Sequence, residues 1–377
     1  MIVADKNSSG LLTKSGHIYL WGHDITRSED DKDGYVVPTY IHHNRFSDDN
    51  NIVLRPYDYQ HKEEFTKLNI GNCMAGIVTK NGKLYTWGYN LCTMLEDGKQ
   101  TRSLIPSLVP PEYFDGEQII DIQMKNLQTG AITISGNVFI WGEVKKYYHI
   151  PILMPQSCFK HEKIIMLRFG DYHSGAITES GKLYMWGNNF DGQLGDCTFV
   201  SKSSPTLIPP DYFGGERIIS LSLGKSNTGV ITESGKLYLW GSTFDGILGV
   251  NSQKDKNYPV LIHPSAFDNE KIVALSIGST HCGVITQSGK LYMWGRNKYG
   301  QLGIYEHCKN YEPTLIPQST FNGEPIVELS LGDDYTLVRT SSNKLYACGR
   351  NQYGQLGIGN FQDRYKFEFV IDINNLI

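Results

Sequence analysis

The apolar positions of the chain recur in one short phrase, in which an apolar and an aromatic residue are followed by any residue and then by Trp-Gly. In the copy at 237–241, large side chains occupy successive positions, whereas a strand with one solvated face would alternate apolar and polar residues. Each copy therefore predicts a short β-strand that is buried on both faces. The seven copies lie at 18–22, 84–88, 138–142, 183–187, 237–241, 291–295 and 345–349.

The tryptophan position of this phrase holds all 6 tryptophans of the protein, and a cysteine replaces it in the last copy. Most neighbouring copies are 54 residues apart, and the interval counted across the two chain ends is nearly as long. A closed ring explains that agreement, whereas an open solenoid does not. We therefore assign a structural, repeated role to Trp21, Trp87, Trp141, Trp186, Trp240, Trp294 and Cys348.

Each repeat contains four short β-rich runs separated by Gly, Pro, Ser and Asp, as at 206–208, 217–223, 228–232 and 236–240. Sheets stacked radially bury both of their faces. The predicted fold is therefore all-β, a seven-bladed β-propeller of four-stranded antiparallel blades that forms a single domain over 1–377. Because 1–22 supplies only inner strands, we expect 365–371 to complete the first blade, so that N- and C-terminal strands share one blade and close the ring.

The last two runs of every repeat are joined by a dipeptide that suits a tight turn. Two-residue hairpins of the primed types need positive φ, which Gly and Asn tolerate best. We therefore predict a two-residue hairpin in every repeat. The dipeptides are Ser-Gly, Asn-Gly or Ser-Asn and lie at 15–16, 81–82, 135–136, 180–181, 234–235, 288–289 and 342–343.

Two further motifs accompany the phrase. Asn, two residues and Gly-Gln-Leu-Gly follow it at 189–195, 297–303 and 351–357, with a near copy at 243–249, and Gly-x-x-His precedes it at 170–173 and 278–281. In these motifs nearly the whole chain resembles the regulator of chromosome condensation repeat family. The resemblance implies a seven-bladed propeller that binds partners on the two rims of the ring.

The same resemblance implies a range of functions. The founding member of the family is a guanine-nucleotide exchange factor for the Ran GTPase that also binds chromatin, and other relatives are ubiquitin-ligase modules, light receptors, enzyme inhibitors and docking platforms. Our first interpretation is a non-catalytic scaffold that binds a protein partner through its rim loops. The alternatives are a guanine-nucleotide exchange factor for a small Ran-like GTPase and a chromatin- or DNA-associated protein.

The first three repeats lose the Asn-x-x-Gly-Gln-Leu-Gly motif, so the divergent loops fall in one part of the ring. Loops on a rigid scaffold often carry recognition, and we predict a partner-binding rim there; drift in exposed loops is the alternative interpretation. The predicted partner-binding residues are His42, His43, Arg45, Arg55, Tyr57, Tyr59, Lys145, Lys146 and Tyr147.

Composition narrows the classes of partner. The chain has 20% charged and 40% hydrophobic residues, as folded proteins do, and its net charge of −4 without a Lys/Arg run makes nucleic acid an unexpected partner. No stretch approaches the roughly 20 apolar residues of a membrane span, so no membrane partner is expected.

The 7 dispersed cysteines form no C-x-x-C pair, which predicts reduced thiols in cytoplasm or nucleus. Abundant Asn, Ile, Lys and Tyr is typical of AT-rich genomes, including those of large DNA viruses, which adds the virion as a location.

The sequence offers little catalytic chemistry. His173 and His281 are interpreted as structural side chains that bond nearby backbone, because other residue types hold their position in the remaining repeats. A zinc site on Cys158 and His161 lacks further ligands with suitable spacing. The glycines at 187 and 192 lack the Lys-Ser or Lys-Thr of a phosphate loop. We therefore predict no enzyme activity, no catalytic residue, no metal and no cofactor.

Overall fold

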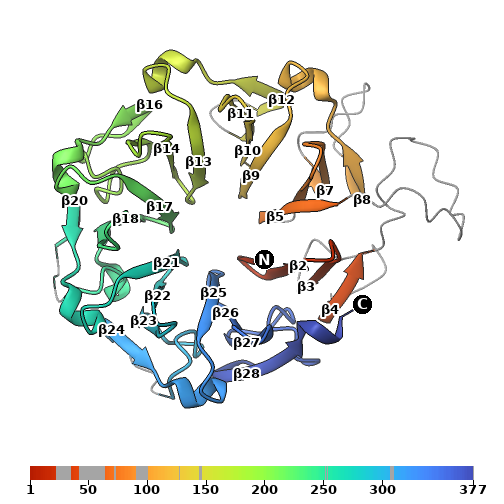
Figure 1. Cartoon of the computed structure of the whole chain (residues 1–377), viewed down its shortest axis with the longest axis vertical. Helices are drawn as coiled ribbons and strands as arrows, with labels where there is room; N and C mark the ends of the chain where they lie inside the picture. Colours follow the sequence, from red (N-terminus) through yellow and green to blue (C-terminus); the bar gives the residue numbers. More distant parts are fainter. Residues whose placement is uncertain are drawn as a thin grey trace, which may run out of the picture.

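The computed structural model shows seven four-stranded antiparallel sheets arranged as the blades of a propeller around a central opening (Figure 1). The structure describes residues 1–22, 35–41, 64–71, 74–90, 101–126, 128–143, 147–250, 252, 254–305 and 310–376. Strands of the Trp-Gly phrase, such as β19 (Leu237–Gly241), are buried along their whole length. The predicted fold class, a seven-bladed propeller, is confirmed.

Each blade is built from four strands that follow one another in the chain, from the innermost strand outwards. Blade 1 comprises β1 (Ile2–Asp5), β2 (Ser8–Leu12), β3 (Ile18–Gly22) and β4 (Tyr35–Ile41), and blade 2 comprises β5 (Phe65–Gly71), β6 (Met74–Thr79), β7 (Leu84–Asn90) and β8 (Thr101–Leu108). Blade 3 comprises β9 (Ile119–Lys125), β10 (Gln128–Thr133), β11 (Val138–Glu143) and β12 (Tyr147–Leu153). Blade 4 comprises β13 (Ile164–Phe169), β14 (His173–Thr178), β15 (Leu183–Gly187) and β16 (Lys202–Leu207).

The remaining blades repeat this order. Blade 5 comprises β17 (Ile218–Leu223), β18 (Asn227–Thr232), β19 and β20 (Lys256–Leu261), and blade 6 comprises β21 (Ile272–Ile277), β22 (His281–Thr286), β23 (Leu291–Gly295) and β24 (Asn310–Ile316). Blade 7 comprises β25 (Ile326–Leu331), β26 (Tyr335–Thr340), β27 (Lys344–Gly349) and β28 (Arg364–Asp372). Short 3-10 helices are η2 (Pro111–Phe114), η3 (Gln156–Phe159), η4 (Pro210–Phe213), η5 (Phe244–Gly246), η6 (Pro264–Phe267), η7 (Gln318–Phe321) and η8 (Ile373–Asn375).

The prediction that the two chain ends share one blade is wrong. The segment 365–371 lies in β28, which pairs with β27 as the outer strand of blade 7, and blade 1 takes its outer strand from β4. The run at 206–208, predicted to belong with the strands that follow it, overlaps β16, which is the outer strand of the preceding blade. A regular spacing in a ring does not reveal which strand begins a blade, and this explains the error.

Blades 7 and 1 are instead joined side by side, without sharing a strand. The backbone N–H of Ile2 donates to Glu328 Oε1 at 2.7 Å, and that of Ala4 donates to Ser330 Oγ at 2.9 Å. The buried aromatic residues Trp21 and Tyr335 lie in one apolar cluster that spans the seam. The ring is thus closed by side-chain packing and hydrogen bonds between neighbouring blades.

The hairpins between the second and third strands are longer than predicted. At the first hairpin the N–H of Gly16 donates to Thr13 O at 3.2 Å and that of Thr13 donates to His17 O at 2.9 Å. Only the second residue of each predicted dipeptide has positive φ, for example Gly235 at 86° and Asn343 at 67°. Each hairpin therefore has a three-residue loop whose last residue is left-handed. The sequence identified the left-handed residue correctly but not the length of the loop.

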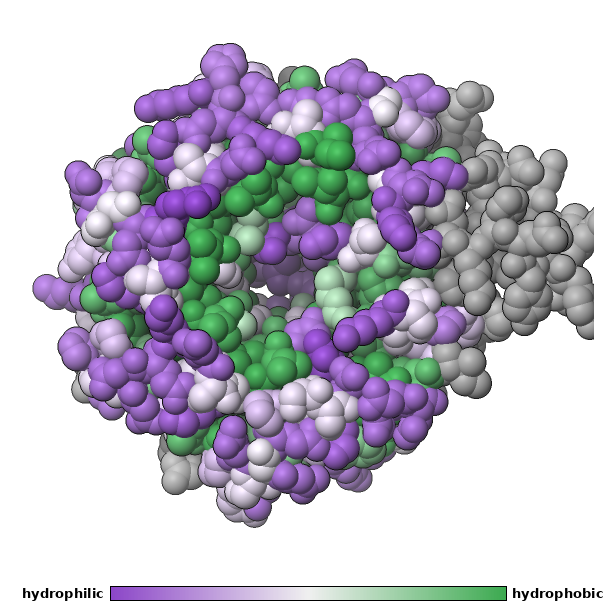
Figure 2. Space-filling model, in the orientation of Figure 1, coloured by the Kyte–Doolittle hydropathy of each residue, from purple (hydrophilic) through white to green (hydrophobic). Residues whose placement is uncertain are grey.

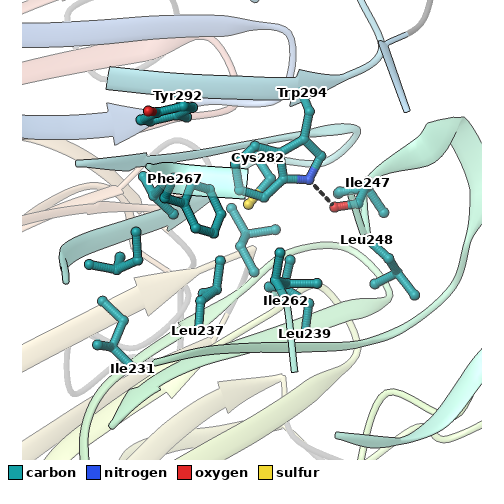
Figure 3. Close-up of a cluster of buried hydrophobic side chains, with 13 residues drawn as sticks. Ile231, Leu237, Leu239, Ile247, Leu248, Ile262, Phe267, Cys282, Tyr292 and Trp294 are labelled. Atoms are coloured by element: carbon teal, nitrogen blue, oxygen red, sulfur yellow. Dashed lines mark hydrogen bonds between the residues drawn. The ribbon is translucent and has the colours of Figure 1, made fainter. Parts of the chain in front are cut away.

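Neighbouring blades are tied together by the tryptophan of the repeated phrase. The indole Nε1–H of Trp294 donates to Ile247 O at 2.8 Å, in the loop between β19 and β20 of the preceding blade (Figure 3). Trp240 makes the same bond to Gln193 O, and Trp21 makes it to Gln355 O across the seam, both at 2.9 Å. All six tryptophans are at most 7% exposed. In Trp21, Trp240 and Trp294 the indole therefore fills the space between two blades and satisfies its only polar group there.

Blade 7 replaces this tryptophan by a compensating pair of residues. Cys348 takes the tryptophan position, and its thiol lies 3.5 Å from Gln301 O. The ring of Phe367 in β28 lies against Gly303, as Trp240 lies against Gly195 and Trp294 against Gly249 in other blades. A smaller residue in the third strand is thus offset by a larger one in the outer strand.

Candidate protein-binding surface

The innermost strands present a repeated pattern of exposure. In β17 the first residue, Ile218, is buried between blades, whereas the second, Ile219, is 51% exposed. The start of each inner strand lies beside a hairpin, since Ile218 N–H donates to Gly181 O and Ile272 N–H to Gly235 O, both at 3.0 Å. We call this side of the ring the hairpin face, and the side with the loops between third and fourth strands the loop face.

On the hairpin face, the second residue of the inner strand is a β-branched aliphatic residue in five consecutive blades. We call these five residues the apolar collar; they are Ile120, Ile165, Ile219, Val273 and Val327, and they are 37% to 56% exposed. Figure 1 shows their strands, β9, β13, β17, β21 and β25, side by side around the centre, and Figure 2 shows apolar surface around the central opening. A contiguous exposed apolar patch of this kind is typical of interaction sites.

Charged residues border the collar. Lys163, Arg217 and Lys271 directly precede the inner strands of blades 4, 5 and 6 and are partly or fully exposed. The backbone carbonyl of each accepts a hydrogen bond from the hairpin of its own blade. For example, Glu179 N–H donates to Lys163 O at 2.8 Å, and Glu233 N–H donates to Arg217 O at 3.0 Å. The collar therefore has an apolar centre with a polar border, the usual anatomy of a protein-binding patch.

Deeper in the channel, side chains join neighbouring inner strands. The fifth residue of an inner strand accepts a backbone N–H from the next blade: Ser222 Oγ from Ile277 at 3.0 Å and Ser276 Oγ from Leu331 at 3.1 Å. These polar groups are used within the ring. The collar residues at the mouth have no such role, and their exposed side chains remain available for contact with a partner.

At the loop face the channel holds a buried charge cluster. Lys125 forms an ion pair with Asp5 and lies 3.8 Å from Asp171 Oδ1. Burial raises the pKa of the Asp5 carboxyl, while Asp5, Asp333 and Asp171 together hold the pKa of Lys125 above its ordinary value despite burial. The lysine is therefore charged, and its ion pairs fix the inner strands at this mouth.

The two histidines of the Gly-x-x-His element are structural, and each bonds a threonine side chain of the next blade. His173 Nε2 lies 2.9 Å from Thr228 Oγ1 in the next blade, and Thr228 donates its only proton to Gln193 O at 2.7 Å. His173 Nε2 must therefore donate to the threonine. Burial lowers the pKa of both His173 and His281 to about 3, so both rings are neutral at pH 7.

The glycine-containing loop at 187–195 is organised by Asn189. Asn189 Oδ1 accepts from Leu194 N–H at 2.9 Å, and Nδ2 donates to Thr198 O at 3.0 Å. The loop is thus braced internally by an asparagine amide. Gly192 has a φ of 78°, which suits a turn, and lies against Asn257 of the next blade.

No metal centre emerges in the described part of the chain, where no group of three or more His, Cys, Asp or Glu side chains is placed to hold an ion. Cys158 lies half-buried in η3. Among the described residues, no helix has the length and hydropathy needed to cross a membrane.

The predicted partner-binding residues lie almost entirely outside the described residues. This holds for His42, His43, Arg45, Arg55, Tyr57, Tyr59, Lys145 and Lys146, whereas Tyr147 begins β12. The collar was missed by the sequence analysis, although the chain carries a signal for it. Blades 3 to 7 each begin with two consecutive β-branched aliphatic residues, of which the structure buries the first and exposes the second.

A family model described as an RCC1-like domain matches residues 145–375. Among curated relatives, the ultraviolet-B receptor UVR8 of Arabidopsis thaliana is 30% identical over 295 residues, which cover 78% of this chain and 54% of the receptor. The chain thus spans about half of the length of that relative.

Two solved structures share the fold. Human WBSCR16 has a TM-score of 0.77 at 19% identity, with 94% of each chain covered. Prp20p from Saccharomyces cerevisiae, described with its binding to Gsp1p and histones, has a TM-score of 0.76 at 18% identity and covers 100% of this chain and 88% of its own. At these identities the likeness concerns the architecture alone.

Proposed function

Because this chain belongs to the family of RCC1-like domains, we propose that it is a non-catalytic propeller that binds a protein partner. The observation that carries the proposal is the apolar collar, five exposed aliphatic side chains around one mouth of the channel. Covering the exposed half of one such side chain contributes about 1 kcal/mol, so five together supply several kcal/mol to an interface. We expect the partner to present an apolar protrusion that enters this mouth.

The test compares the collar with a matched apolar surface elsewhere on the ring. Ile219→Asp with Val273→Asp places two charges in the collar, and Leu261→Asp with Leu315→Asp does the same on the outer strands β20 and β24, where both leucines are similarly exposed. Affinity purification with mass spectrometry from the native cell should recover a partner with the wild type and the outer-strand variant and lose it with the collar variant. Retention by the collar variant would reject the collar as the contact surface.

Nucleotide exchange on a small Ran-like GTPase is the alternative. It is supported by the likeness to Prp20p, which is described with its binding to Gsp1p, and by no described residue of this chain specifically. Release of a fluorescent GDP analogue from a panel of small GTPases tests it, and rates equal to intrinsic release would exclude it.

Association with DNA is the weaker alternative at a net charge of −4, and a gel shift at low salt tests it. We also propose a cytoplasmic or nuclear location, which cell fractionation tests.

A further inference from the structure

The loop between the third and fourth strands of blade 5 lacks the asparagine that braces the same loop in other blades. In blades 4, 6 and 7 the amide oxygen of Asn189, Asn297 or Asn351 accepts a backbone N–H five residues further on, at 2.9 to 3.0 Å. The amide nitrogen donates to a carbonyl later in the loop, for example Asn351 Nδ2 to Asn360 O at 2.8 Å. Blade 5 has Thr243 at this position.

Thr243 keeps the backbone bond of this loop but has no amide. As the N–H of Asn351 in blade 7 donates to Asp363 Oδ1 at 2.7 Å, the N–H of Thr243 donates to the acid twelve residues on. The backbone N–H and the hydroxyl of Thr243 both donate to Asp255 Oδ1, at 2.7 and 3.1 Å. Ser252 Oγ, which stands where Thr198 stands in blade 4, donates to Lys254 O at 3.3 Å. A pocket of about 380 Å³ opens here, and it is lined by Ser242, Thr243, Phe244, Asp245, Ser252, Asp255 and Tyr311.

The walls of this pocket combine aromatic rings with carboxylates. Phe244 is 72% exposed and Tyr311 of β24 is 47% exposed. Asp255 offers an exposed carboxylate of which Oδ1 takes both bonds from Thr243. Asp245 is buried, with Oδ2 3.8 Å from Arg296 Nη1. The charge of Asp245 is thus already paired, and Asp255 is the exposed acid among the described residues that line the pocket.

These features select the chemistry of a ligand. The exposed carboxylate of Asp255 disfavours anions and favours cations, and aromatic faces attract cations further. A guanidinium satisfies the site better than an ammonium, because it is planar, stacks on aromatic rings and presents several N–H donors to carboxylate and carbonyl oxygens. The amide nitrogen of the asparagine in the other blades donates N–H groups to its loop. In blade 5 a ligand with N–H groups supplies these donors instead.

We propose that the pocket between Phe244 and Tyr311 binds the guanidinium of an arginine side chain presented by a partner protein. The pocket lies on the loop face, opposite the apolar collar, so it is independent of the collar as a contact surface. Phe190 provides an internal comparison. It holds the position of Phe244 in blade 4 and is 74% exposed, but Asn189 braces its loop.

The binding test uses the full chain and the probe N-acetyl-arginine N-methylamide, followed by saturation-transfer NMR. The matched probe is the citrulline analogue, which has the same shape and no charge. We expect the arginine probe to bind and the citrulline probe to bind about ten-fold more weakly, because a cation–aromatic contact together with a partly exposed carboxylate contributes on the order of 1.4 kcal/mol. Equal binding of the two probes, or no binding of the arginine probe, overturns the proposal.

Variants locate the site. Thr243→Asn restores the asparagine of the other blades and should abolish binding of the arginine probe without lowering the thermal stability. Phe244→Ala alters an exposed side chain, so the fold should persist while binding falls. Phe190→Ala, the matched control in blade 4, should bind as the wild type does. Unchanged binding by Thr243→Asn, or an equal loss in Phe190→Ala and Phe244→Ala, would show that the probe binds elsewhere and reject the pocket.

Discussion

Lys125 and Asp5 form an ion pair between the ends of two inner strands that are not neighbours in the ring, β9 of blade 3 and β1 of blade 1. Asp5 and Lys125 each end their inner strand. The equivalent position in the other five blades is a glycine, namely Gly71, Gly170, Gly224, Gly278 and Gly332. The two departures from glycine therefore carry opposite charges and meet in the channel. The pair links the first blade to the third across the mouth on the loop face.

We expect Lys125→Gly to lower the free energy of unfolding by about 3 kcal/mol, because it leaves the buried Asp5 carboxylate without its cation. The double variant Asp5→Gly, Lys125→Gly has the glycine of the other blades at both positions. Its loss in free energy of unfolding should be much smaller than the sum of the losses in the two single variants. Urea unfolding of the single and double variants measures both quantities. Strictly additive effects would show that the two residues do not interact.

The pair Cys348 and Phe367 in blade 7 should behave as one packing unit. Cys348→Trp places an indole where the Phe367 ring already lies against Gly303, and overpacking of this kind costs about 1–3 kcal/mol. The double variant Cys348→Trp, Phe367→Pro recreates the Trp and Pro found at these positions in blades 4 to 6, where the prolines are Pro205, Pro259 and Pro313. We expect thermal unfolding of the double variant to occur at a higher temperature than that of Cys348→Trp alone.

The buried histidines predict a loss of stability in mild acid. The pKa of His173 and His281 is lowered to about 3 in the folded protein, against about 6.5 in an unfolded chain. Between these values the unfolded state binds protons that the folded state does not. The free energy of unfolding should therefore fall as the pH drops below about 6.5, by up to about 1.4 kcal/mol per pH unit for each histidine.

The variant His173→Asn, His281→Asn tests this dependence, since asparagine occupies the same position in blade 5 as Asn227. Its free energy of unfolding should change less between pH 6.5 and pH 4 than that of the wild type, whatever its value at pH 7. Identical slopes for the two proteins would contradict the assignment of the proton uptake to these histidines.

A second acid-sensitive group lies at the hairpin of blade 5. Hydrogen bonds from Lys236, Ser234 and Thr232 lower the pKa of Glu216 to about 2. The ionised Glu216 carboxylate therefore stabilises the folded state fully above its unfolded pKa of about 4.3, and this stabilisation is lost as the pH falls through 2. Glu216→Gln should therefore lower the urea midpoint at pH 7, and the difference from the wild type should vanish near pH 2.

The sequence predicted the ring because spacing and buried strands are encoded locally in each repeat. It misplaced the strand 365–371 because a periodic pattern does not state where a blade begins, and only the pairing of β28 with β27 settles that. The collar escaped notice because Ile218 and Ile219 look alike in sequence and differ only in which side of the inner strand they occupy. Thr243 was visible as a departure from the motif, but the pocket depends on bonds between residues far apart in the loop.

Since every blade uses one uninterrupted stretch of chain, each can be completed as soon as its own residues have left the ribosome. Blade 1 then waits with one flank unpaired until blade 7 has been synthesised, and Trp21 gains its acceptor, Gln355 O, only at that point. Translation arrested before blade 7 would leave this flank accessible to chaperones or to a second nascent chain. When blades form in the order of their synthesis, the final step in the assembly of the ring joins blade 1 to blade 7.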